Sequence, residues 1–127
     1  MRYKPMLAVD FDGVICENVW PEKGKPMPGV INALHLLSKK YRIIIWTCRE
    51  KTHKDDMIKW LSEYEIKYDS INRMPIYSGW PEGVFKFIWQ SLMDLNSQKV
   101  FADMYIDDRN FGGFPGWEII LKILLDK

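Results

Sequence analysis

The chain has 127 residues, of which 47% are hydrophobic and 28% are charged, and its formal net charge is +1. This composition excludes global disorder, and the length predicts a single domain spanning residues 1–127. The near-neutral charge argues against a broad basic surface for nucleic acid or anionic membrane, although a local pocket for one phosphate is compatible with it.

The N-terminal residues run directly into the first predicted strand, and the longest apolar stretches are far shorter than a membrane span. We therefore expect a cytoplasmic protein that has no signal peptide and does not enter a membrane. The two cysteines, Cys16 and Cys48, are expected to be reduced and buried as small hydrophobic residues. A redox role is the alternative, because each follows a segment that we assign to the candidate site.

The first predicted strand, at residues 7–9, is an apolar run that ends in Asp10-Phe11-Asp12-Gly13. A run without polar alternation is typical of a buried parallel strand, and open α/β sheets bind ligands beyond the carboxyl ends of such strands. Asp10 and Asp12 would raise each other's pKa unless a cation lay between them. Oxygen ligands without a nearby histidine or cysteine pair indicate a hard ion, Mg²⁺. The alternative is a turn in which the aspartates cap backbone amides.

Residues 16–29 are rich in proline and glycine, which predicts an irregular flap over the strand ends. Trp20 in this flap is a candidate for substrate contact or, alternatively, for pinning the flap to the body of the protein. An amphipathic helix is predicted at residues 30–41, and an apolar, β-branched strand at residues 42–46. The stripe of this helix that we expect to face the core comprises Val30, Ile31, Leu34, Leu37 and Tyr41.

A second helix is predicted from about residue 52 to 65, a short strand at residues 66–68, and a loop at residues 69–83. Residues 84–95 are compatible with a helix whose apolar surplus indicates core or an oligomer face. Another strand is predicted at residues 100–106, interrupted by Asp103, and a last helix at residues 117–125. The inward-facing residues expected in the second and last helices are Met57, Ile58, Leu61, Tyr64, Ile119, Ile120, Ile123 and Leu124.

The alternation of strands and helices predicts an α/β fold, a three-layer α/β/α sandwich with a mainly parallel central sheet. Three of its strands end in residues that are capable of chemistry, namely Asp10 and Asp12, Thr47 and Arg49, and Asp107 and Asp108. Capping alone explains such a set poorly, whereas a phosphoryl-transfer site explains it well. Asp10 would attack phosphorus and form an aspartyl-phosphate. Asp12 would protonate the leaving oxygen and later activate the hydrolytic water.

The same residues suggest a metal site. Asp10 and Asp107 would hold Mg²⁺, with the carbonyl of Asp12 adding an oxygen and Asp108 orienting coordinated water. A lysine is needed to balance the negative charge; Lys99 is the candidate and Lys86 the reserve.

Several residues are expected to contact the phosphate. Thr47 and the backbone amides from Phe11 to Gly13 would donate hydrogen bonds to its oxygens. Cys48 and Arg49 lie next to Thr47 and are assigned to the same pocket. For Arg49, solvation at the surface or pairing with Glu50 and nearby aspartates is the alternative to reading an anionic group.

Four motifs resemble those of the haloacid dehalogenase (HAD) superfamily: Asp10-Phe11-Asp12-Gly13-Val14-Ile15, the strand-terminal Thr47, a lysine upstream of the last motif, and Tyr105-Ile106-Asp107-Asp108. The resemblance spans residues 7 to about 110. It implies a Rossmann-like fold in which the first and fourth strands are adjacent at the centre, with the metal between their ends, and Mg²⁺-dependent phosphatase chemistry. The dehalogenases themselves lack an aspartate equivalent to Asp12, so Asp12 indicates the phosphatases. The last motif, Ile106-Asp107-Asp108-Arg109-Asn110 followed by a Gly-Gly turn, is similar to that of small capless members.

No segment is long enough for a separate cap domain, which implies a macromolecular substrate or a neighbouring subunit as the lid. Trp20, Trp80 and residues 84–89 are the candidates for that contact. We expect a phosphorylated small-molecule substrate, with a phosphorylated macromolecule as the alternative, and a homo-oligomer is compatible with the sequence. The alternative functions are a receiver-like phosphoacceptor and a binding module that keeps the fold without turnover.

Overall fold

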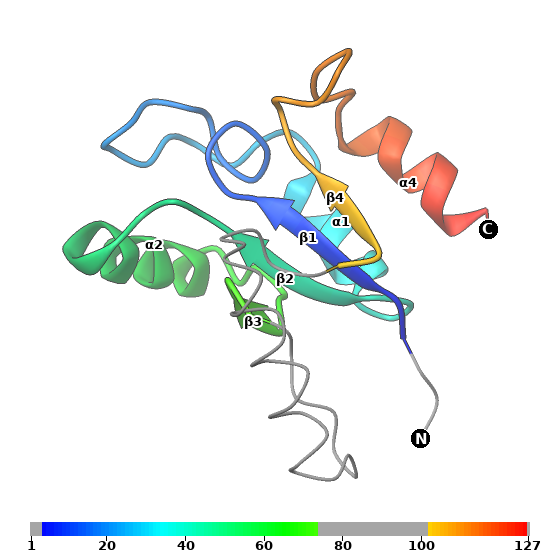
Figure 1. The fold of residues 1–127 in the computed structure, drawn as a ribbon, viewed down its shortest axis with the longest axis horizontal. Coiled ribbons are helices and arrows are strands. Elements are labelled where there is room, and N and C mark those ends of the chain that lie inside the picture. Colours follow the sequence, from blue (N-terminus) through cyan, green and yellow to red (C-terminus); the bar gives the residue numbers. More distant parts are fainter. Residues whose placement is uncertain (1–3, 74–101, 127) are drawn as a thin grey trace, which may run out of the picture.

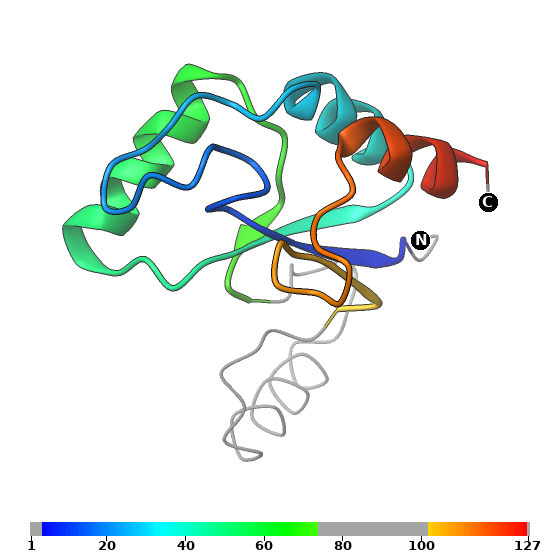
Figure 2. The ribbon, with the colours of Figure 1, turned by 90° about the horizontal axis from the view of Figure 1, so that it is seen from above.

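The computed structural model describes residues 4–73 and 102–126, and a parallel sheet lies at its centre (Figure 1). The sheet has the order β3-β2-β1-β4 and consists of β1 (Met6–Asp10), β2 (Arg42–Trp46), β3 (Ser70–Ile71) and β4 (Met104–Ile106). Helices α1 (Val30–Leu37), α2 (Lys51–Glu63) and α4 (Trp117–Leu125) lie on one face of it (Figure 2). The predicted α/β, Rossmann-like fold with a parallel sheet is therefore confirmed.

The central strand β1 is buried on both faces. Leu7 and Val9 belong to the core that the helices cover, while the side chains of Met6 and Ala8 alternate to the other face and are equally buried. A strand enclosed on both sides must be apolar throughout, which is why its sequence shows no polar alternation.

The register of the strands brings their carboxyl ends to one edge. Asp10 pairs with Trp46 of β2, and Val9 pairs with Ile106 of β4, all in parallel. The arrowheads of β1, β2 and β4 accordingly point toward the same side of the sheet (Figure 1). The adjacency of the first and fourth strands is confirmed, although β4 is the outermost strand on its side among the described residues.

Helices α1 and α4 pack side by side and tie the end of the chain to its beginning. The indole Nε1 of Trp117 donates a hydrogen bond to the carbonyl of Val14 (2.8 Å), and the Tyr41 hydroxyl donates to the carbonyl of Leu124 (3.3 Å). Helix α1 is shorter than predicted because the chain turns after Leu37, whose carbonyl accepts the amide of Tyr41 (2.8 Å).

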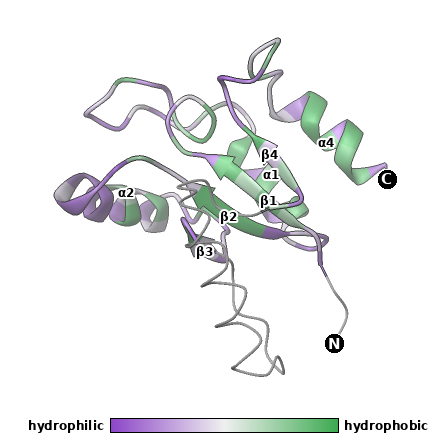
Figure 3. Cartoon of the chain, in the orientation of Figure 1, coloured by the Kyte–Doolittle hydropathy of each residue, from purple (hydrophilic) through white to green (hydrophobic). Residues whose placement is uncertain are grey.

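The faces that the helices bury are narrower than the sequence predicts. Five residues expected to face the core are exposed by more than a third of their surface, namely Ile31, Ile58, Tyr64, Ile119 and Ile123. Ala33, Trp60 and Trp117 are buried in their stead. Most of the α4 ribbon is green in Figure 3, so its apolar pattern alone does not mark the side that packs.

The third strand also differs from its prediction at residues 66–68. The amide of Ile66 donates back to the carbonyl of Leu61 (3.0 Å), so this residue is bonded to the C-terminal end of α2 and not to the sheet. Pairing with β2 starts only at Asp69, whose amide donates to the carbonyl of Ile43 and whose carboxylate accepts the amide of Ile43 (2.8 Å each).

Two other predicted elements lie wholly or partly outside the described residues. These are the whole helix at residues 84–95 and the first residues of the strand at 100–106. Asp103, expected to interrupt that strand, precedes β4 and accepts the backbone amide of Met6 through its carboxylate (2.7 Å). Within residues 4–73 and 102–126, no helix combines the length and the apolar character needed to cross a membrane.

Candidate active site

Three carboxylates from distant parts of the chain meet at the carboxyl edge of the sheet. Asp10 is the last residue of β1, and Asp107 and Asp108 directly follow β4. One oxygen from each of these side chains lies within 4.8 Å of the others, and all three residues are partly buried. The expectation that Asp10 and Asp107 lie close enough to share an ion is met, and the group could hold a metal ion.

The electrostatics of this group favour a cation. Burial raises the pKa of Asp10 to about 8, with further contributions from the charges of Asp107 and Asp108, a hydrogen bond with Asp108, and the charge of Asp12. Without a cation, the charged form of this carboxyl group is therefore strongly disfavoured. A divalent cation would remove the repulsion, and a donor set made only of carboxylates suits a hard ion.

The turn after β1 has room for glycine alone at position 13. Gly13 has φ of +89°, a conformation that residues with a side chain rarely adopt. A Cβ atom at this position would also collide with Oδ2 of Asp108. Gly13 thus allows the acidic residue after β4 to lie directly against the backbone after β1.

Two amides that the sequence assigns to phosphate binding are already paired. The amide of Phe11 donates to the carbonyl of Trp46 (3.2 Å), which extends the ladder between β1 and β2. The amide of Gly13 donates to the carbonyl of Cys16 (2.8 Å) and closes the turn. The ring of Phe11 is buried and packs edge-on against Trp60, with 5.3 Å between ring centroids. Phe11 and Gly13 therefore support the structure of the site.

Thr47 is also a structural part of the strand end. Its hydroxyl accepts the backbone amide of Arg49 (3.0 Å), and its side chain is buried. The side chain of Asn72 bonds to both the amide and the carbonyl of Thr47 (2.8 Å each). This role of Asn72 was not predicted, because the residue stands in a polar loop with no pattern that singles it out.

A pocket of about 460 Å³ opens above the acidic group. Its lining combines both aspartate pairs with polar and aromatic side chains, namely Asp10, Asp12, Asn18, Trp20, Trp46, Cys48, Arg49, Asp107, Asp108 and Arg109. Thr47, Phe11 and Gly13 are absent from this lining. Asn18 and Trp46 were not predicted, although Trp46 is paired with Asp10 in the sheet and so reaches the same edge.

The two cysteines differ in their surroundings. Cys16 is buried as predicted, and burial raises the pKa of its thiol to about 11. Cys48 is exposed, so the expectation that it is buried is wrong. It lies beyond the end of β2, where the chain borders the open pocket instead of the core.

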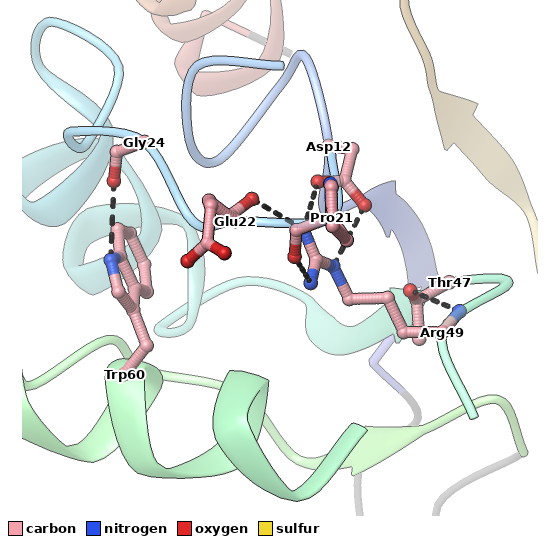
Figure 4. Close-up of polar contacts among 7 residues, drawn as sticks. All are labelled: Asp12, Pro21, Glu22, Gly24, Thr47, Arg49 and Trp60. Atoms are coloured by element: carbon pink, nitrogen blue, oxygen red, sulfur yellow. Dashed lines mark hydrogen bonds and ion pairs between the residues drawn. The ribbon is translucent and has the colours of Figure 1, made fainter. Parts of the chain in front are cut away.

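Asp12 is not part of the three-carboxylate group, and its carboxylate pairs with an arginine (Figure 4). Arg49 donates from Nε to Oδ2 of Asp12 (3.0 Å) and from an Nη atom to Oδ1 (2.7 Å). The side chain of Arg49 is almost fully buried, which excludes surface solvation and confirms the alternative of pairing with a nearby aspartate.

The predicted site residues Lys99 and Lys86 lie outside the described residues, as do Trp80 and residues 84–89. Their roles therefore stay predictions. Trp20 is described: it lines the pocket, is 55% exposed, and packs against the ring of His53 with 5.1 Å between centroids.

The comparisons with known proteins give one informative relationship. No model of a known protein family matches the chain, and no curated protein matches it. Structures of the Pnkp1/Rnl/Hen1 complex and of the Pnkp1/Rnl/Hen1 RNA repair complex are 18% identical over 84% of this chain, covering 40% and 37% of those chains with TM-scores of 0.47 and 0.48, a level from which nothing is concluded. A conserved protein encoded by a locus of Bacteroides thetaiotaomicron is 31% identical, with a TM-score of 0.76, over 98% of this chain and 92% of that one. The chain belongs to the same family as this conserved Bacteroides protein.

Proposed function

We propose that the protein is a Mg²⁺-dependent phosphomonoester hydrolase of the HAD type that works through an aspartyl-phosphate on Asp10. The observation that carries the proposal is the meeting of Asp10, Asp107 and Asp108 within 4.8 Å at the end of a pocket that Asp12 also lines. The order of the HAD-like motifs along the chain supports the same assignment.

The chemistry divides between two carboxyl groups. An oxygen of Asp10 forms a bond to phosphorus while the bond from phosphorus to the leaving oxygen breaks, and Asp12 gives its proton to that oxygen. In the second step Asp12 takes a proton from water, whose oxygen bonds to phosphorus as the bond to Asp10 breaks. When bound, Mg²⁺ would offset the negative charge of the phosphate and of the carboxylates. Asp107 and Asp108 would hold the ion with Asp10.

The remaining roles follow from position. Cys48 and Arg109 line the pocket and are proposed to border the bound phosphate. Lys99 is proposed as the positive charge beside the carboxylates. A pocket of about 460 Å³ suits a small molecule, so a phosphorylated small molecule is the proposed substrate.

Hydrolysis of 4-nitrophenyl phosphate with Mg²⁺ tests this function. We expect turnover that EDTA stops and added Mg²⁺ restores, and a loss of at least about 1000-fold in Asp10→Asn because the nucleophile is removed. Asp56→Asn, on the exposed surface of α2, is the matched control and should behave as the wild type.

Two results would contradict the proposal. One is full activity in Asp10→Asn, and the other is no hydrolysis of any member of a panel of phosphorylated metabolites, oligonucleotides and peptides. A long-lived phosphoprotein without turnover would indicate the receiver-like alternative. The panel also separates small substrates from macromolecular ones.

A further inference from the structure

Arg49 bonds to two parts of the site that both lie far from it in the sequence. It follows β2, and its guanidinium forms the paired hydrogen bonds with Asp12 described above. The same group donates to the carbonyls of Pro21 and Glu22 (2.9 Å each), at the tip of the loop formed by residues 17–25. Figure 4 shows the guanidinium between this loop and the Asp12 carboxylate.

These contacts use most of the hydrogen-bonding capacity of Arg49. Four of the five N–H groups of an arginine are engaged. The flat group also lies near two rings, 5.3 Å from the centroid of Phe11 and 4.8 Å from that of Trp20. A side chain that is 2% exposed and so fully bonded is poorly placed to bind a substrate anion, the role that the sequence assigned to it.

We propose instead that Arg49 is a positioning residue for Asp12, which fixes the orientation of the proton-transferring carboxyl group and locks it to the 17–25 loop. This inference rests on the proposed function, since it concerns how Asp12 works in that reaction. The base of the loop has supports of its own, because Trp60 Nε1 donates to the carbonyl of Gly24 (3.2 Å) and the amide of Glu17 to that of Lys25 (2.9 Å). Arg49 acts on the tip that carries Trp20.

The geometry suits proton transfer through Asp12. Each carboxylate oxygen accepts one hydrogen bond from Arg49, which leaves a lone pair on each oxygen for the transferred proton. The proton passes from Asp12 to the leaving oxygen in the first step and from water to Asp12 in the second. Arg49 keeps its charge and its protons throughout. A lysine would retain the charge but not the planar fork that holds both oxygens.

The test compares leaving groups. 4-Nitrophenolate leaves with little need of a proton, whereas an alkoxide such as that of glycerol phosphate needs one. Because kcat/KM reports the first phosphoryl transfer, we expect Arg49→Lys to lose at least about 100-fold on glycerol phosphate and less than about 10-fold on 4-nitrophenyl phosphate. Arg42→Lys is the matched control, since Arg42 pairs with Asp69 (3.4 Å) away from the site and should keep both rates.

A double substitution tests whether Arg49 acts through Asp12. On glycerol phosphate, where Arg49→Lys alone should lose most, Asp12→Asn with Arg49→Lys should be within about threefold of Asp12→Asn alone, because the carboxyl group that Arg49 orients is already lost. Multiplicative losses would overturn the inference, as would equal losses of Arg49→Lys on both leaving groups. Wild-type turnover and its loss in Asp10→Asn would survive either result, so the proposed function is judged separately.

Limited proteolysis gives a readout that needs no activity. The 17–25 loop contains Lys23, and freeing its tip should speed tryptic cleavage after this residue by about 10-fold in Arg49→Lys and not in Arg42→Lys. Arg49→Gln, which keeps part of the hydrogen bonding, serves if the lysine variant does not fold. Unchanged cleavage in a folded variant would contradict the role of Arg49 in holding the loop.

Discussion

The carboxyl group of Asp10 links the stability of the protein to pH. Its pKa is raised by burial and by its acidic neighbours from 3.8 to about 8 in the folded, metal-free protein. The folded state therefore binds a proton that the unfolded chain releases near pH 4. The stabilising contribution of this proton is complete below about pH 4, declines as the pH rises, and is lost above about pH 8.

Asp10→Asn should remove this pH dependence, because an amide stays neutral at every pH. In EDTA at pH 8 we expect the variant to be more stable than the wild type by about 1–3 kcal/mol, and nearly equal to it at pH 4. Urea denaturation at both pH values measures the difference. Added Mg²⁺ should narrow this difference in stability at pH 8 by stabilising the wild type alone. Equal stabilities of wild type and variant in EDTA at pH 8 would refute the burial of an uncharged Asp10.

Gly13 and Gly112 separate backbone strain from crowding of the site. Both have φ of +89°, but a Cβ atom meets Asp108 only at Gly13 and has no neighbour within 4 Å at Gly112. Gly13→Ala and Gly112→Ala should each lose about 1 kcal/mol of stability to strain. Only Gly13→Ala should also lose Mg²⁺ binding, measured by calorimetry, because it displaces Asp108. Equal Mg²⁺ affinity in the two variants would argue against the close fit.

Among the elements, α4 shows what a sequence pattern does and does not fix. The apolar run correctly predicted that the helix begins at residue 117 and ends at residue 125. It also predicted that four of its positions face the core, namely Ile119, Ile120, Ile123 and Leu124. Only Ile120 and Leu124 of these are buried, whereas Ile119 and Ile123 lie on a side of α4 that the rest of the described residues leaves exposed. Hydrophobic periodicity reports a possible face, and the neighbouring helix decides how much of it is covered.

Ile120 and Ile123 test that conclusion within one helix. Ile120→Ala should destabilise the protein by about 2–4 kcal/mol, since it removes a buried side chain and leaves a cavity. Ile123→Ala, at a position 54% exposed, should change stability by less than about 0.5 kcal/mol. Thermal unfolding of both variants compares them directly, and similar losses would show that α4 is covered on both sides in solution.

For the molecule as a whole, the acidic group was predictable because parallel strands deliver their carboxyl ends to one edge. Asp10 and Asp107 needed only two recognisable strands and the rule that connects them. The partner of Asp12 was less accessible, because Arg49 lies 37 residues away and its orientation depends on the 17–25 loop. That loop has no periodicity, so its path follows from its contacts with the rest of the protein. The sequence therefore predicts where the acidic group lies, but it leaves the pairing of Arg49 with Asp12 as one of several alternatives.

The two thiols should differ in reactivity, which allows selective labelling of one of them. The chain has only two cysteines, and Cys16 is both buried and held protonated by a pKa of about 11. A maleimide dye should therefore attach to Cys48 alone, at the border of the pocket. The fluorescence of that single label would report ligand binding in the pocket without any engineered residue. In preparations stored without reductant, adducts at the same sulfur would obstruct the pocket.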